Sequence, residues 1–197
     1  MTDRDVILDI LGERPHRLFL VAGGLIVIFA VNTYLKTFTG TSYPVIQGVV
    51  APTGFLVGVV GLFGLYAGLA DRSHTAARVA GVVTAVATVG WIVVIVASTV
   101  LGGEPGGPLT VVPVVTLVSM IIAFGLFGII SIRTGDYSRV VGVLLIVEAI
   151  MFLLVIAGVP GYLIDTGHVL AYFGIGITLR ARVVPSEGAD PTPDSTV

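Results

Sequence analysis

The chain has 197 residues, of which 55% are hydrophobic and only 11% are charged, whereas a typical soluble domain carries about 25% charged residues. A soluble fold could not cover its surface with so few charges, and the mean hydropathy of +1.06 points to the bilayer as the solvent. A net charge of −2 argues against a nucleic-acid partner. The absence of cysteine excludes disulfides, thiolate metal sites and cysteine nucleophiles.

The first predicted element is a short amphipathic helix over residues 3–12. Thr2 and Asp5 have the spacing of a capping box, and apolar side chains then recur on one helical face. We expect this helix to lie on the cytoplasmic membrane surface, with packing against the loops as the alternative. Residues 1–17 are therefore predicted to be a cytoplasmic N-terminal segment, whose mixed charge is not typical of a secretory signal peptide.

Six apolar stretches follow, each long enough to cross a hydrocarbon core of about 30 Å at about 1.5 Å per residue. They cover residues 18–35, 45–70, 76–101, 109–132, 140–158 and 162–179. The predicted fold is an all-α integral membrane protein, a six-transmembrane-helix bundle over residues 18–182. Pro52 and Pro113 fall inside the second and fourth stretches, and we expect each to bend its helix. The last link is so short that the fifth and sixth helices must be antiparallel neighbours.

The basic residues give the orientation. Nine of the ten are arginines that flank one side of the predicted spans, and Lys36 is the sole basic residue on the other side. The arginines are Arg4, Arg14, Arg17, Arg72, Arg78, Arg133, Arg139, Arg180 and Arg182. Because cytoplasmic loops are enriched in Lys and Arg, we expect a multi-pass protein of the cell membrane with both termini in the cytoplasm.

The C-terminal residues 183–197 are acidic and rich in proline, and we predict a disordered cytoplasmic tail. The preference for arginine over lysine, together with abundant Val, Ala, Thr and Gly, resembles the composition of proteins from salt-loving, GC-rich organisms. Codon usage biased toward GC would produce the same pattern without any halophile adaptation.

Two blocks of sequence recur in the same order. The motif Gly-Leu-Phe-Gly occupies residues 61–64 and 125–128, and Arg-Val-Ala-Gly-Val at 78–82 is matched by Arg-Val-Val-Gly-Val at 139–143. Thirteen residues after each arginine stands a large aromatic residue, Trp91 and Phe152. This pattern predicts a duplicated, parallel helical-hairpin repeat. Chance matching in a sequence rich in Gly, Val and Leu is the alternative.

The second span carries glycines at intervals of three or four residues. They are Gly54, Gly58, Gly61, Gly64 and Gly68. Small residues let membrane helices approach closely, so this glycine stripe is predicted to pack against other helices of the bundle. The alternative is that the stripe docks a partner subunit.

Glu148 lies near the middle of the fifth span, where an ionised carboxylate costs about 3 kcal/mol or more. The equivalent residue of the first repeat is Ala87. On the sixth span, Asp165, His168 and Tyr172 share one helical face. His168 lies about 10 Å and Glu148 about 15 Å below the outer helix ends, so a hydrogen bond between them is expected.

Three interpretations of these four residues stay open: a proton or ion relay, polar contacts for a small ligand, and a structural pair that joins the last two helices. We expect no metal or other cofactor, because His168 is the sole histidine in a predicted span and the spacing is not specific for a metal site.

The sequence lacks a Walker loop, HExxH, GxSxG and a dinucleotide fingerprint, which favours a protein that is not an enzyme. The preferred hypothesis is a small transport or membrane ligand-binding protein with a polar cluster between its last two helices. The alternative is a non-catalytic structural subunit of a larger membrane complex, and a membrane enzyme comes third. The expected partners are the lipid bilayer and either further copies of the chain or other membrane subunits.

Overall fold

The computed structural model describes residues 15–70, 73–101 and 110–183. The helices in this part of the chain are α2 (Pro15–Thr39), η1 (Ile46–Val50), α3 (Ala51–Ala70), α4 (His74–Leu101), α5 (Val111–Thr134), α6 (Arg139–Ile156) and α7 (Gly161–Val183). Six of them, counting η1 and α3 together, are long and apolar enough to cross a membrane. The predicted all-α fold with six spans is therefore confirmed, and the chain is a polytopic membrane protein in contact with lipid. The predicted N-terminal helix over residues 3–12 and the tail from residue 184 lie outside the described residues.

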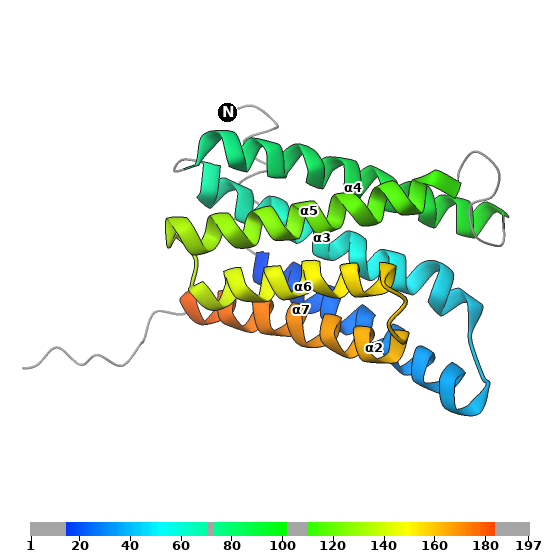
Figure 1. Cartoon of the computed structure of the whole chain (residues 1–197). Helices are drawn as coiled ribbons and strands as arrows, with labels where there is room; N and C mark the ends of the chain where they lie inside the picture. Colours follow the sequence, from blue (N-terminus) through cyan, green and yellow to red (C-terminus); the bar gives the residue numbers. More distant parts are fainter. Residues whose placement is uncertain (1–14, 71–72, 102–109, 184–197) are drawn as a thin grey trace, which may run out of the picture.

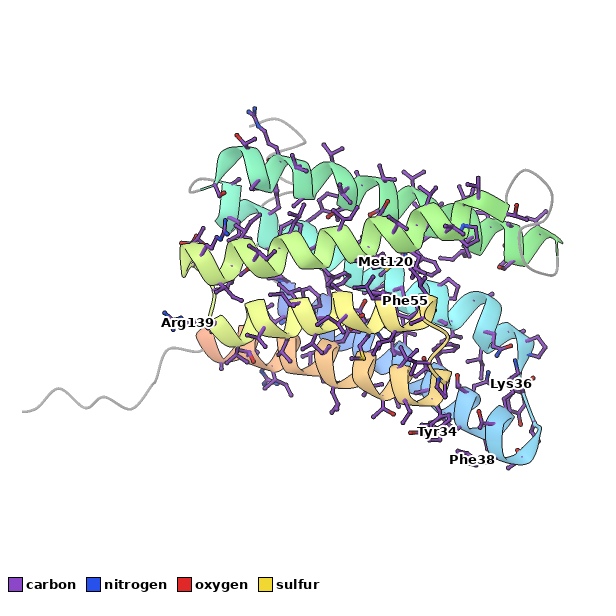
Figure 2. All side chains as sticks on the ribbon, in the orientation of Figure 1. Tyr34, Lys36, Phe38, Phe55, Met120 and Arg139 are labelled. Carbon is purple, nitrogen blue, oxygen red and sulfur yellow. The ribbon has the colours of Figure 1, made fainter. Side chains whose placement is uncertain are left out.

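The six spans are arranged as a closed ring. Each packs against its neighbours along the chain, and α7 returns to pack along α2. Figure 1 shows the long helices side by side, with α6 and α7 as adjacent ribbons. Arg139 and Lys36 mark opposite ends of this ring in Figure 2, and these are called the arginine end and the lysine end below. Because the ring closes, the inward faces of all six spans meet in one core.

Aromatic rings fill the centre of this core, and every span contributes one. They are Phe19, Phe55, Trp91, Phe124, Phe152 and Tyr172. Phe55 of α3 stacks on Trp91 and meets Phe152 edge-on, with ring centroids 5.3 Å apart in both pairs. Figure 2 shows Phe55 in the body of the bundle, between the two ends. The rings thus link helices that are not neighbours in the chain.

The glycine stripe of α3 lies mostly against side chains of this same chain. A Cβ atom at Gly54 would lie 2.9 Å from Ile26 of α2, and one at Gly61 would lie 3.0 Å from the Phe19 ring. Gly58 leaves room for the Tyr172 ring of α7. Gly64 is buried, and the exposed Gly68 lies against the Tyr137 hydroxyl. Small residues at these positions are therefore used for packing within the bundle.

Two helix backbones approach each other closely where Gly128 of α5 faces Gly142 of α6. A Cβ atom at Gly128 would lie 2.8 Å from the carbonyl oxygen of Gly142, and the reverse distance is 2.9 Å. Backbone atoms of a packed helix cannot move aside as a flexible side chain can. A methyl group at either position must therefore push the two helices apart.

Replacing Gly128 by alanine should lower the free energy of unfolding by about 1–3 kcal/mol, the usual cost of overpacking. The matched control is Gly125→Ala on the same helix, where the new Cβ would have only Ala149 within 4.0 Å. Alanine is the better helix former, so the control should be neutral or stabilised by up to about 1 kcal/mol. Equilibrium unfolding in mixed micelles measures both. Equal stability of the two variants would contradict the proposed close contact.

Several helix boundaries differ from the apolar stretches. α2 begins at Pro15 rather than residue 18 and continues to Thr39. Proline suits the first position of a helix because its missing N–H is not needed there. The helix is followed directly by Gly40, which adopts φ 73°. Polar residues can continue a helix past the hydrocarbon core, and hydropathy alone does not reveal where it stops.

The two prolines do not act alike. Immediately before Pro52 the chain forms the π-helical turn η1, and the N–H of Ala51 bonds to the carbonyl oxygen of Ile46. This wider turn accommodates a ring that would otherwise clash with the preceding turn. Pro113 lies in the first turn of α5, where no backbone donor is lost. Because α5 begins at Val111, only two residues before Pro113, this proline interrupts no hydrogen bond within the helix.

Candidate functional site

A tight link sets α6 and α7 side by side. Gly158 adopts φ 75°, a conformation that favours glycine, and Val159 donates its N–H to the carbonyl oxygen of Leu154 at 3.1 Å. Leu163 then donates to the carbonyl oxygen of Pro160 at 3.1 Å as α7 begins. Only residues 157–160 separate the two helices. Residues at similar distances from this link must therefore lie at similar depths.

Glu148 and His168 meet across α6 and α7. A hydrogen bond of 2.7 Å joins Nδ1 of His168 to Oε1 of Glu148. Counted at about 1.5 Å per residue, Glu148 lies about 12 Å from the end of α6 and His168 about 10 Å from the start of α7. Both are buried, with exposures of 0% and 1%. The hydrogen bond expected from the sequence is therefore present, in an interior that holds few other polar groups.

Aromatic rings enclose the imidazole. The ring of His168 lies 4.6 Å from that of Phe152 and 5.2 Å from that of Phe55, measured between centroids. Phe55 approaches in an edge-to-face geometry, with an interplanar angle of 73°. These contacts hold the imidazole in one orientation toward Glu148. They also surround the pair with an environment that stabilises a charge poorly.

Tyr172 lies one turn further along α7, toward the arginine end. It is fully buried between Phe19 and Phe124, and its hydroxyl faces the Glu148 carboxylate without a hydrogen bond of good geometry. Neither this hydroxyl nor Oε2 of Glu148 has a hydrogen-bond partner among the described residues. Buried polar groups are nearly always satisfied, so these two atoms are unusual features of the core.

Asp165 lies one turn from His168 in the other direction, toward the lysine end. Its carboxylate is 5% exposed, lies beside Thr33 of α2 and interacts electrostatically with His168. Its Oδ2 atom has no hydrogen-bond partner in the described part of the chain. The structure thus brings all four predicted site residues together, and it adds α2 as a third wall.

The polar cluster, defined as Glu148, Asp165, His168 and Tyr172, contains two carboxyls and one imidazole. Six basic residues in the described part of the chain are exposed near the helix ends: Arg17, Lys36, Arg78, Arg133, Arg139 and Arg180. No arginine or lysine among them reaches the cluster. Within residues 15–70, 73–101 and 110–183, no group of three or more Asp, Glu or His has the arrangement of a metal site.

Sequence reasoning missed the residues that wall the cluster from the opposite side of the ring. Phe55 touches His168 although the two are far apart in the chain, and Thr33 borders Asp165. Phe55 stands within the glycine stripe, one residue after Gly54. The sequence did not predict its contact with His168, because the hydropathy pattern does not determine the order of the helices around the ring.

Comparisons with models of protein families, with curated proteins and with solved structures found no match. The chain is a polytopic membrane protein whose described core holds a buried carboxyl–imidazole pair.

Proposed function

We propose that the chain is a small transport or ligand-binding protein of the cell membrane, and that Glu148, Asp165, His168 and Tyr172 form its working site. The observation that carries this proposal is the buried hydrogen bond between Glu148 and His168. A carboxyl group and an imidazole in an apolar interior oppose stability unless each is paired. The Oε2 atom of Glu148 has no hydrogen bond of good geometry, although the Tyr172 hydroxyl faces the same carboxylate, and this carboxyl group is the one that we propose takes up a proton or a polar ligand.

The proposed orientation places the arginine end in the cytoplasm. Arg17, Arg78, Arg133, Arg139 and Arg180 lie near helix ends that alternate along the chain, and Lys36 lies at the opposite end. The positive-inside rule then puts both termini in the cytoplasm and the short α6–α7 link outside. Asp165 is consequently the member of the cluster nearest to the outer surface.

The proposed duplication relates the hairpin of α3 and α4 to that of α5 and α6. Two observations support it. Ala87 and Glu148, equivalent in the alignment of the repeats, are both buried. Trp91 and Phe152, also equivalent, both contact the ring of Phe55. In this reading the acid at position 148 belongs to one repeat only, as a site added to a duplicated scaffold would.

Glu148→Gln should abolish ligand binding while preserving the fold, because glutamine keeps the shape but cannot carry the charge. Native mass spectrometry of protein extracted gently from its own membrane should show a discrete added mass on the single chain. The variant should lose that mass and lose any thermal stabilisation the ligand gives. The control is Ser131→Ala, a buried hydroxyl remote from the cluster, which should keep both. An added mass that survives Glu148→Gln would exclude this site.

The alternative function is a non-catalytic subunit of a larger membrane complex. The glycine stripe of α3 no longer favours it, since Gly54, Gly58 and Gly61 face side chains of this same chain. Such a subunit would have to use another face. Co-extraction with other polypeptides at a fixed ratio, without an added ligand mass, would favour this alternative.

A further inference from the structure

We propose that the polar cluster is a proton-binding site that is neutral when it holds two protons, and that it exchanges them only from the lysine end of the bundle. This inference rests on the proposed function and names the proton as the species that the site handles. The geometry points to it through three features: a polarity gradient along α7, the charge balance of the cluster, and the aromatic wall around it.

The buried face of α7 changes character halfway along its length. Residues on this face follow each other at intervals of three and four: Asp165, His168, Tyr172, Ile175 and Leu179. All are buried. The first three, toward the lysine end, can gain or lose a proton, whereas the last two are aliphatic. A proton that enters along this face therefore finds no further carrier beyond Tyr172.

The neighbouring helix shows the same division. On α6, the buried residues between Glu148 and the arginine end are Leu145, Gly142 and Val141. On α3, the buried residues Leu62, Leu65 and Leu69 line the same half of the core. Among the described residues, the titratable side chains of this half are only half-buried: His16, Asp136 and Tyr137 lie at the arginine end, and the Tyr137 hydroxyl donates to the carbonyl oxygen of Leu65. The half of the core nearer the arginines is thus an apolar barrier.

Charge balance sets the number of protons. With both carboxyls ionised and the imidazole neutral, the cluster carries a charge of −2, so two bound protons bring it to zero. An uncompensated charge in such an apolar interior is costly. One of these protons belongs to the pair of Glu148 and His168, where the 2.7 Å distance lets it reside on either atom. The other belongs to Asp165, which no cation neutralises.

Asp165 is the entry point of the proposed path. It lies about 6 Å from the start of α7, and Thr166 beside it is exposed. From there the next turn of the same buried face leads to His168, and the hydrogen bond leads to Glu148. The depth of the titratable groups therefore increases step by step from the lysine end.

No other titratable group faces the cluster from the surrounding helices in the described part of the chain. The side chains that surround it include Thr33 and Phe19 from α2, Phe55 from α3, Phe124 from α5 and Phe152 from α6, and Trp91 of α4 packs behind Phe55. Tyr172 itself belongs to the cluster. A pH response of the core can therefore be assigned to these four residues.

The fluorescence of Trp91 can report the protonation of the cluster. Trp91 is the sole tryptophan of the chain and stacks on Phe55, which touches His168. The protein is reconstituted into vesicles of neutral phosphatidylcholine with a buffered interior, and the external pH is varied. The chain has no cysteine, so a Thr41→Cys variant and a membrane-impermeant maleimide give the fraction of molecules whose lysine end faces outward.

In the molecules whose lysine end faces outward, we expect the fluorescence emission of Trp91 to change with the external pH. In the remaining molecules the emission should change only after a proton ionophore has equalised the internal and external pH. Asp165→Asn and Glu148→Gln should each shift the midpoint by about one pH unit or more, or remove the change. Ser131→Ala should leave it unaltered. A midpoint that neither site variant moves, or a response that follows the pH at the arginine end, would overturn the proposal.

The pH experiment and the ligand experiment can fail independently of each other. A pH response without any added mass would retain proton binding and remove the proposed ligand. An added mass without a pH response would retain ligand binding and remove the proton site.

Discussion

Replacing His168 alone by leucine should destabilise the bundle by about 3–5 kcal/mol, the usual cost of leaving one partner of a buried pair unmatched. The Glu148 carboxyl would lose its 2.7 Å hydrogen bond and remain fully buried among aromatic rings. It would then be held in protonated form or would disrupt the packing around it. Equilibrium unfolding in mixed micelles, followed by far-UV circular dichroism, measures the loss.

The double variant Glu148→Leu with His168→Leu should recover most of this stability, because replacing a whole buried pair by apolar side chains is often neutral or stabilising by about 1–4 kcal/mol. The four proteins form a thermodynamic cycle whose interaction energy isolates the pair. A double variant that is as unstable as the single one would show that both side chains are needed for packing, independently of their hydrogen bond.

This cycle also separates structure from function. If the pair serves only to join α6 to α7, the double variant should keep every property of the native protein. If the pair binds protons or a ligand, a stable double variant should lose the pH response of Trp91 or the added mass. Retention of a costly buried pair is then explained by what it does rather than by what it stabilises.

The parts of the fold that sequence reasoning predicted are those decided within one helix or one short link. The six spans follow from the length of the apolar stretches, because a bilayer demands about 20 apolar residues per helix. The hydrogen bond between Glu148 and His168 follows from the short link after α6, because that link makes α6 and α7 antiparallel neighbours and brings the two residues to similar depths.

The parts that it missed depend on contacts between distant helices or on local backbone adjustment. α2 closes the ring against α7 and brings Thr33 to Asp165, a contact that no periodicity encodes. Whether a proline disrupts a helix depends on where that helix begins. Pro113 removes no hydrogen bond within α5, because the helix starts only two residues before it.

At Tyr172, the effect on stability of removing the whole ring can be compared with the effect of removing the hydroxyl alone. The ring is fully buried, with Phe19 and Phe124 on either side and Gly58 beneath it. Tyr172→Ala should therefore leave a cavity at the meeting point of four helices and lower the free energy of unfolding by about 3–5 kcal/mol. Thermal and equilibrium unfolding in micelles measure this loss.

Tyr172→Phe keeps the ring and deletes only a hydroxyl that has no hydrogen-bond partner among the described residues. It should be as stable as the native protein or slightly more stable, since an unsatisfied buried polar group costs about 1–3 kcal/mol. A marked loss of stability would show that the hydroxyl is hydrogen-bonded after all, with Glu148 as its nearest acceptor. If stability is kept but the pH response of Trp91 shifts, the hydroxyl acts on the proton held by Glu148 and not on the packing of the helices.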